Sequence, residues 1–230
     1  MVTKRFVCLA NSRKHSGRCV AGIELGTGRW VRPISDRAGR ELSILERRCP
    51  DGTEPALLDV IDVPVVGHQP DGVHRENWLI ETGAPWRRPG RMAWGGARTF
   101  SRDAGPLWAN GHQTSGGVND VVPADELDVA GGTLRLVHVD AVTVEVARAP
   151  YRANDRRPTV RVRFEHAGDE YAFKLTDPLQ ETRFREAGIG SHVLGESLLT
   201  VSLSEEFDDR FYKLVAAIIE RATARPRNRP

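Results

Sequence analysis

The sequence has few cysteines, no long apolar run and almost no net charge. Its three cysteines, Cys8, Cys19 and Cys49, show no CxxC spacing, and the odd number argues against a disulfide framework. No stretch approaches the roughly 18 apolar residues of a membrane helix, and the apolar run from Phe6 to Ala10 is too short for a signal peptide. We therefore expect a cytoplasmic protein with reduced thiols and no membrane contact.

The sequence also lacks the short motifs of common enzyme classes. It contains no Walker loop, no GxSxG elbow and no dinucleotide-binding fingerprint, and Gly26-Thr27-Gly28 is typical of a hairpin turn. The seven histidines show no HxH or HExxH spacing, so a metal site would need residues that converge from distant positions. We predict no catalytic residue, no metal and no cofactor.

Positive charge is concentrated near the start of the chain. The net charge is only +2, but residues 1–48 hold eleven Lys or Arg against four Asp or Glu. Like charges concentrated in one part of a protein attract polyanions such as nucleic acid. The alternative is an ordinary solvated surface, because 29 of the 33 basic residues are Arg, a bias that a GC-rich genome can produce without function.

Short alternating patterns predict a mostly β protein. Turn-forming residues separate the apolar runs, and the clearest hairpin has Val160, Val162 and Phe164 alternating with charged residues. Strands are expected at 5–10, 19–25, 29–35, 57–66, 74–81 and 133–146, with the hairpin over 159–178 and a short helical piece over 179–187. The final segment FYKLVAAIIE fits both a helical stripe and a buried strand.

Composition divides the chain into two lobes. We expect a first barrel-like lobe over 1–81 and a second over 133–222, followed by a disordered basic tail over 223–230. The intervening stretch 82–132 contains ten of the 22 glycines and three tryptophans but little periodicity. It predicts a long irregular connection that packs on the barrels.

Several separated motifs together resemble the dual OB-containing domain family. They are KRFVCLANSRKHSGRCVAGIEL with GRWVRPIS, PLWANG with GGVNDVV, RVRF with YAFKLTDP, and LTVSLSEEF with YKLVAAII. The resemblance covers nearly the whole chain, and it implies a bacterial protein with two OB-like barrels. It also implies nucleic-acid binding, in some members near defence or mobile-element genes, and it favours a strand for YKLVAAII.

The turn SRKHSGR and the strand after it form the main candidate interface. Cations and hydroxyls at a barrel rim suit phosphates, and a strand-3 aromatic suits base stacking. The predicted nucleic-acid-binding residues are Ser12, Arg13, Lys14, Arg18, Trp30 and Arg32. The alternative is that Trp30 fills the barrel core and the turn is merely solvated.

Two further segments are possible ligand loops. One contains Asn119 and Asp120, and the other contains Lys174, Thr176 and Asp177. Both patterns are also typical of structure alone, because a buried turn or a helix cap uses the same side-chain hydrogen bonds. The structural interpretation is favoured for both segments.

These observations support one main hypothesis and two alternatives. The main hypothesis is a non-catalytic protein that binds nucleic acid, DNA or RNA and preferentially single-stranded, or a nucleotide. The first alternative is a protein-interaction or scaffold subunit that docks on a larger helicase, nuclease or ATPase. The second is an enzyme that acts on a nucleotide or another small molecule in the Trp-rich stretch.

Overall fold

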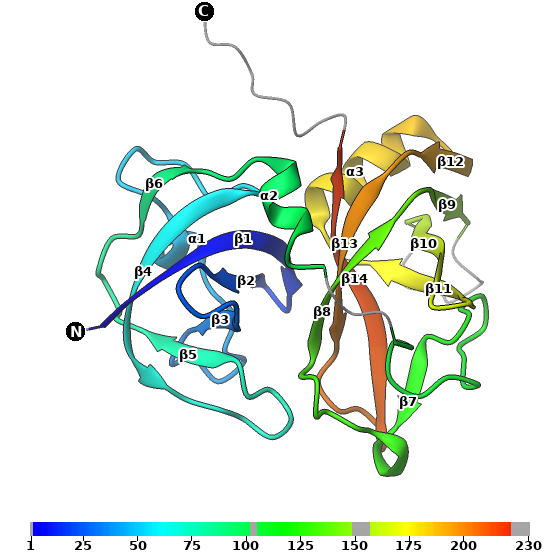
Figure 1. Cartoon of the computed structure of the whole chain (residues 1–230), viewed down its shortest axis with the longest axis horizontal. Helices are drawn as coiled ribbons and strands as arrows, with labels where there is room; N and C mark the ends of the chain where they lie inside the picture. Colours follow the sequence, from blue (N-terminus) through cyan, green and yellow to red (C-terminus); the bar gives the residue numbers. More distant parts are fainter. Residues whose placement is uncertain (1, 102–104, 149–156, 222–230) are drawn as a thin grey trace, which may run out of the picture. The chain divides into compact units, whose positions relative to one another are not determined.

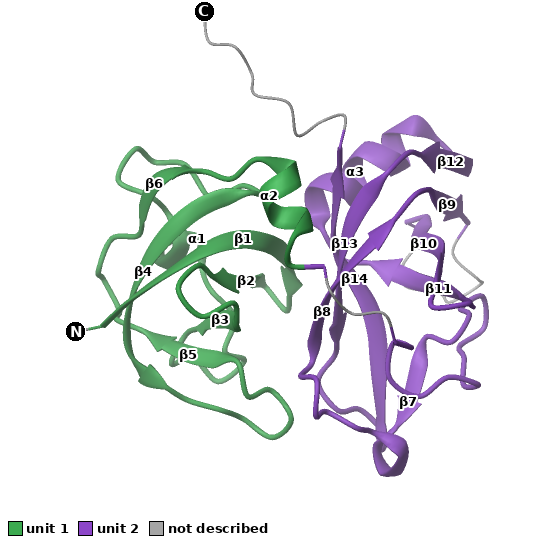
Figure 2. Ribbon diagram, in the orientation of Figure 1, with its two compact units in different colours: residues 1–100, 224–230 green, residues 101–223 purple. Residues whose placement is uncertain are grey.

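The structure, a computed structural model, confirms the mostly β prediction. It describes residues 2–101, 105–148 and 157–221, with 49% of the chain in strands and 11% in helices. The chain forms two compact units, residues 1–100 and residues 101–223 (Figure 2).

The first unit is a closed five-stranded barrel (Figure 1). Its strands are β1 (Val2–Lys14), β2 (Gly17–Glu24), β3 (Trp30–Ile34), β4 (Asp59–His68) and β5 (Asn77–Ile80), with helix α1 (Ile44–Arg47) between β3 and β4. The strand order is β1-β2-β3-β5-β4, and β4 pairs with β1 to close the barrel. The pairing of β3 with β5 is parallel and the others are antiparallel. This connectivity is that of an OB fold.

The long strand β1 closes the barrel because its two halves pair with different neighbours. Residues 2–7 pair with β4 and residues 6–14 pair with β2, and the register shifts between Cys8 and Ala10. Such an irregularity lets a strand bend around a small barrel. The core that the bend encloses is built from Phe6, Cys8, Val20, Val31, Leu42, Cys49, Ile61, Val63, Val65, Ile80 and Trp86.

The second unit repeats this connectivity with its first strand divided in two. Strand β8 (Leu134–Val139) pairs with β13 (Ser197–Leu203), whereas β9 (Val142–Ala147) pairs with β10 (Thr159–His166). The order continues through β11 (Asp169–Leu175) and β14 (Arg210–Glu220), and β11 and β14 are parallel. Helix α3 (Pro178–Ala187) follows β11, and the extra strand β12 (Gly190–Leu194) pairs with β9. Together the two units are consistent with two OB-like domains, as predicted.

The ambiguous segment FYKLVAAIIE is a strand, β14. It pairs with β13 from Lys213 to Glu220, and every residue from Val215 to Ile219 is buried. A helix would bury only one stripe of this sequence, whereas a strand in the interior of a sheet buries both faces. Burial on both faces therefore explains why the helical periodicity was misleading.

The stretch 82–132 is divided between the two units and is not a separate connection. Strand β6 (Arg87–Arg91) pairs with β4 and helix α2 (Trp94–Arg98) follows it, both in the first unit. Strand β7 (Val121–Pro123) pairs with β14 in the second unit, and a short 3-10 helix (Ala124–Glu126) follows. The expected boundaries near 81 and 133 thus differ from the division at residue 100. The predicted basic tail lies outside the described residues.

Candidate nucleic-acid interface

The predicted turn SRKHSGR is the end of the β1–β2 hairpin. Arg13 pairs with Arg18 across the two strands, and Lys14 pairs with Gly17. The two-residue loop between the strands places His15 at φ 46°, in the left-handed region. Cross-strand partners share a face of the sheet, so Arg13 and Arg18 lie side by side. The structure therefore brings three predicted cations together at one end of the first barrel.

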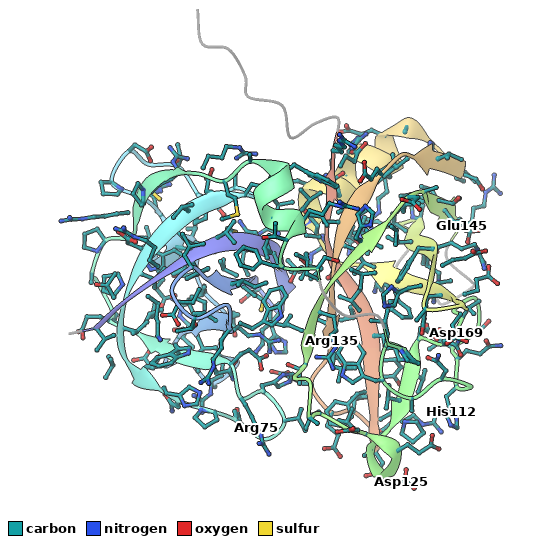
Figure 3. All side chains as sticks on the ribbon, viewed as in Figure 1. Arg75, His112, Asp125, Arg135, Glu145 and Asp169 are labelled. Carbon is teal, nitrogen blue, oxygen red and sulfur yellow. The ribbon has the colours of Figure 1, made fainter. Side chains whose placement is uncertain are left out.

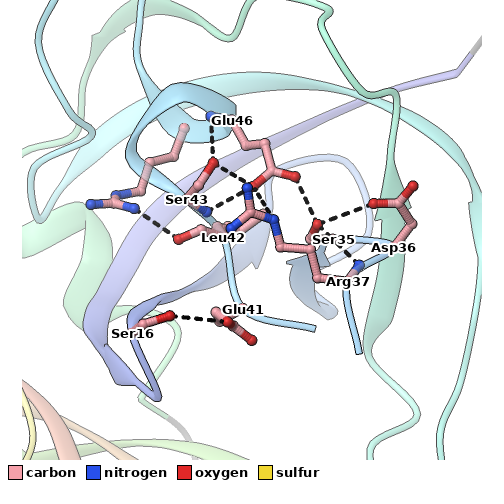
Figure 4. Close-up of polar contacts among 9 residues, drawn as sticks. Ser16, Ser35, Asp36, Arg37, Glu41, Leu42, Ser43 and Glu46 are labelled. Atoms are coloured by element: carbon pink, nitrogen blue, oxygen red, sulfur yellow. Dashed lines mark hydrogen bonds and ion pairs between the residues drawn. The ribbon is translucent and has the colours of Figure 1, made fainter. Parts of the chain in front are cut away.

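The connection between β3 and α1, residues 35–43, braces this hairpin end, and we call it the bracing segment. The Ser16 hydroxyl donates to Glu41 Oε1 at 3.3 Å (Figure 4), and the backbones of Arg18 and Leu42 exchange hydrogen bonds at 3.0 and 2.9 Å. A Cβ on Gly17 would lie 2.5 Å from the Leu42 carbonyl oxygen, so only glycine allows this approach. The cations are thus carried on a fixed hairpin and not on a loose loop.

The bracing segment is itself held by the start of α1 (Figure 4). The Ser43 side chain and Glu46 form a capping box, and Glu46 also accepts from Ser35 Oγ at 2.7 Å. Burial acts to raise the pKa of Glu46, but hydrogen bonds from Ser43 and Ser35 and the charge of Arg37 lower it below its ordinary value. The carboxylate therefore stays ionised, which keeps this support in place at neutral pH.

Two of the predicted contact residues are not at the surface. Ser12 is 6% exposed and lies inside the hairpin. The Arg32 guanidinium is buried, with Nη2 2.7 Å from Glu76 Oε1 and Nη1 3.0 Å from His74 Nδ1. The β4–β5 connection supplies both partners, and a buried guanidinium needs such a carboxylate to offset its desolvation. Ser12 and Arg32 are therefore not available as contact residues of the interface. Trp30 is half-buried at the start of β3, opposite Ile23.

A cluster that the sequence did not reveal surrounds Trp78 on β5. Lys4 Nζ lies 3.7 Å from the ring centroid of Trp78 and 2.9 Å from Glu24 Oε1, and the ring of His68 lies 4.9 Å from Trp78. Lys4, His68 and Trp78 come from β1, β4 and β5, and they meet only because the barrel closes. The contacts with Lys4 and His68, together with packing against the core, hold the Trp78 ring in the barrel wall.

In the second unit, residues 105–123 form what we call the strap. Its Val118 exchanges backbone hydrogen bonds with Ala172 of β11, and its Asp120 carbonyl accepts from the backbone of Lys213 on β14. Strands β11 and β14 pair directly only at Lys174–Leu214 and Leu175–Val215. The strap thus fills the gap where these two strands diverge, and β7 at its end continues the pairing with β14.

Asn119 and Asp120 hold the strap together. Asn119 accepts from the Gly111 backbone at 2.8 Å and donates to the Glu170 carbonyl at 3.0 Å. Asp120 is 4% exposed; it accepts from Thr114 N at 2.7 Å and Thr114 Oγ1 at 2.6 Å, and it lies 3.1 Å from Arg161 Nη1. These contacts fix the backbone turn of the strap.

The segment after β11 is likewise structural. Asp177 is the N-cap of α3 and accepts from the backbone of Leu179 at 2.9 Å and of Gln180 at 3.3 Å, with Pro178 in the first turn. The Thr176 hydroxyl donates to the Val215 carbonyl at 3.2 Å. Lys174 alone of the three predicted ligand residues points to solvent.

A buried lysine, which the sequence analysis missed, fixes the strap to the barrel. Lys213 is 1% exposed, and its Nζ donates to the Ala109 carbonyl at 2.6 Å and to Asn110 Oδ1 at 2.9 Å. The Asn110 amide donates in turn to Asp169 (Figure 3) and to the Tyr171 hydroxyl. The sequence predicts this burial once the segment is assigned as a strand, because alternation then places Lys213 on the same face as the buried Phe211 and Val215.

Burial lowers the pKa of Lys213 to about 8, against the opposing charges of Asp120 and Asp169. In the unfolded chain Lys213 has its ordinary pKa of 10.5. Between pH 8 and 10.5 the unfolded chain therefore binds this proton more tightly than the folded chain does. The contribution of Lys213 to the free energy of unfolding is therefore constant below about pH 8 and rises through that window, by on the order of 2 to 3 kcal/mol. Urea denaturation between pH 7.5 and 10 should show this gain for the wild type relative to Lys213→Met, whereas parallel curves would contradict it.

A pocket of about 530 Å³ opens in the second unit beside the break between β8 and β9. Its charged lining consists of Asp140, Glu165, Glu170 and Arg163, and Arg163 is held by Glu145 at 2.9 Å and Glu170 at 2.6 Å. An excess of carboxylates repels phosphate, so this pocket is no part of a nucleic-acid surface.

Among residues 2–101, 105–148 and 157–221, no group of three or more His, Cys, Asp or Glu side chains is placed to hold a metal ion. No helix in that part of the chain is long and apolar enough to cross a membrane.

The two repeated OB connectivities agree with a comparison against known families. The model of the dual OB-containing domain matches residues 4–218, from β1 to near the end of β14. The chain belongs to the dual OB-containing domain family. No curated protein and no solved structure matches it. In this dual OB-containing chain, the motifs PLWANG and GGVNDVV form the strap, and YAFKLTDP runs through β11 into the cap of α3.

Proposed function

We propose that this protein is a non-catalytic nucleic-acid-binding protein of the bacterial cytoplasm, and that it holds a single strand at the β1–β2 hairpin end of its first barrel. OB domains generally bind nucleic acids. The observation that carries the proposal is the position of Arg13, Lys14 and Arg18, which lie at the loop between OB strands 1 and 2. This loop is one of the two that contact oligonucleotides in OB folds.

Charge and exposure around the hairpin support the same proposal. Arg13 is exposed at the hairpin end, and Arg37, in the bracing segment, has a half-exposed side chain 3.6 Å from Glu46. The β4–β5 connection, which corresponds to the second ligand loop of an OB fold, carries the exposed Arg75 (Figure 3). Cations on both loops suit a phosphate backbone, and the half-buried Trp30 offers part of a ring to a base.

Removing the three hairpin cations should weaken binding and reduce its salt dependence. For the triple variant Arg13→Ala, Lys14→Ala, Arg18→Ala, the slope of log K against log salt should fall by about 2, because each phosphate contact on a single strand contributes about 0.7. Fluorescence anisotropy with a 30-nucleotide oligothymidine at several salt concentrations measures the slope. A matched variant lacking Arg183, Arg210 and Arg221, three exposed cations of the second unit, should bind as the wild type does. Absence of binding by the wild type at low salt would overturn the proposal.

A second candidate function is docking on a larger helicase, nuclease or ATPase. Strand β12 is an edge of the second sheet: it pairs with β9 on one side, and no strand of the described residues lies on its other side. Val193 within it is 75% exposed, and Ile189, which directly precedes it, is 59% exposed. An open edge with apolar side chains suits strand addition by a partner. Co-purification of such a partner from the native host, with no oligonucleotide binding by the isolated chain, would favour this function.

A further inference from the structure

Strand β6 is an edge strand on which every residue is exposed. Its sequence is Arg87-Arg88-Pro89-Gly90-Arg91, and it follows Trp86, whose side chain is only 1% exposed in the barrel core. The backbone pairs with β4 at Asp59, Val60 and Asp62. The strand is therefore fixed to the barrel at its start and along its length, and its arginines are held on a defined surface.

The carboxylates that pair with the arginines of this surface are more buried than the arginines are. Arg91 Nη1 is 3.0 Å from Asp59 Oδ1, and Arg5 on β1 donates from Nε and Nη2 to the two carboxylate oxygens of Asp62, at 2.6 and 2.7 Å. The side chains of Asp59 and Asp62 are 6% and 14% exposed, whereas those of Arg91 and Arg5 are 48% and 59% exposed. Solvent therefore meets guanidinium groups at this surface, with the carboxylates beneath them.

Arg87 is the most available of these cations. It is exposed, it stands opposite Asp62 in the β4–β6 pairing, and its side chain has no ion pair or hydrogen bond to any residue the structure describes. Both carboxylate oxygens of Asp62 already accept hydrogen bonds from Arg5. The row Arg5, Asp62, Arg87 across β1, β4 and β6 thus carries an excess positive charge on its outer face.

The occupant that fits this edge is a phosphate backbone and not another β-strand. Pro89, in the middle of β6, has no N–H, so the edge offers no continuous ladder for strand addition. Guanidinium groups bind phosphate oxygens in a bidentate manner. From Arg87 to Arg91 an extended strand spans about 13 Å, which is the rise of roughly four nucleotides along one strand of a duplex.

We propose that Arg87 and Arg91 of β6, together with Arg5, bind the phosphate backbone of nucleic acid. This contact is separate from the one at the hairpin end. The proposal rests on the proposed function and extends it to a second surface of the same barrel. Arg87 is its main contact, because binding a phosphate there requires no ion pair to break. Arg88, which lies 2.7 Å from Asp51 and 3.5 Å from Asp59, serves to hold the strand.

The test is Arg87→Ala, with 30-nucleotide oligothymidine and a 30-base-pair duplex as probes. Arg87→Ala should lower affinity at low salt by about 3- to 10-fold and reduce the salt slope by about 0.7 for the single strand and 0.9 for the duplex. Arg87→Lys should keep the slope because it keeps the charge. Arg210→Ala, which removes an exposed strand arginine of the second unit, is the matched control and should leave both quantities unchanged.

The outcomes separate this surface from the hairpin end. Weaker binding by Arg87→Ala together with wild-type binding by the hairpin triple variant supports the β6 surface and overturns the hairpin proposal. Wild-type affinity and slope for Arg87→Ala, with loss in the triple variant, overturns the β6 surface. A wild type that binds neither probe at low salt overturns both.

Discussion

Replacing Gly22 by alanine is expected to destabilise the first barrel by roughly 4 kcal/mol, at the upper end of single-residue effects. An alanine Cβ at this position would lie 1.9 Å from the Val7 carbonyl oxygen and 2.6 Å from Phe6 Cδ2. Both neighbours belong to β1, and Phe6 is fully buried in the core. Relief of the contact would require β1 and β2 to separate, which breaks the antiparallel pairing between these two barrel strands.

The measurement for Gly22→Ala is the midpoint of urea denaturation, with Gly26→Ala as its matched control. A Cβ on Gly26 would meet nothing within 4 Å, and its backbone is not in the left-handed region. The control should therefore stay within about 0.5 kcal/mol of the wild type. A Gly22→Ala protein that denatures at the wild-type urea concentration would show that β1 and β2 are not packed as described.

Replacing Gly117 by alanine is expected to cost about 3 kcal/mol in the second unit. The added Cβ would lie 2.0 to 2.3 Å from the carboxylate atoms of Asp120. That carboxylate cannot turn away without losing its bonds to Thr114 and Arg161. Displacement would leave buried polar groups unpaired, which is the main source of the expected loss.

A double-mutant cycle isolates the cause of the Gly117 effect. If the clash acts through the Asp120 carboxylate, the losses from Gly117→Ala and Asp120→Ala should sum to more than the loss in the double variant. Gly105→Ala is the control, because a Cβ there meets nothing within 4 Å. Additive losses would mean that Gly117 is required for another reason.

The sequence alone correctly predicted those parts of the fold in which apolar alternation or a turn motif coincides with the pairing of neighbouring strands. The alternation of Val160, Val162 and Phe164 correctly predicted a hairpin with one buried face, and the turn SRKHSGR correctly marked the end of another. Strand β6 gave no such signal, because no apolar residue alternates in RRPGR. Its position depends on Trp86, which anchors it in the core, and on β4, which pairs with it.

Contacts between distant residues explain most of what the sequence did not predict about the candidate site. Arg32 was expected at the surface, but Glu76, 44 positions later, neutralises it in the interior. Lys213 was taken for part of an apolar segment, yet its partners Ala109 and Asn110 lie in the strap. Burial of a charged group depends on a partner that only the closed barrel brings near, so the pattern around Arg32 or Lys213 alone could not reveal it.

The strap also determines which part of the chain can fold by itself. A fragment starting at residue 133 would contain β8 to β14 but would lack Ala109 and Asn110, leaving the Lys213 ammonium buried without acceptors and the gap between β11 and β14 open. An autonomous second domain must therefore begin before Leu107, whose backbone also donates to the Tyr171 hydroxyl. During synthesis the strap emerges long before its partner, because Asn110 precedes Lys213 by 103 residues. Completion of this domain thus awaits β14, an order that predicts slow, late folding.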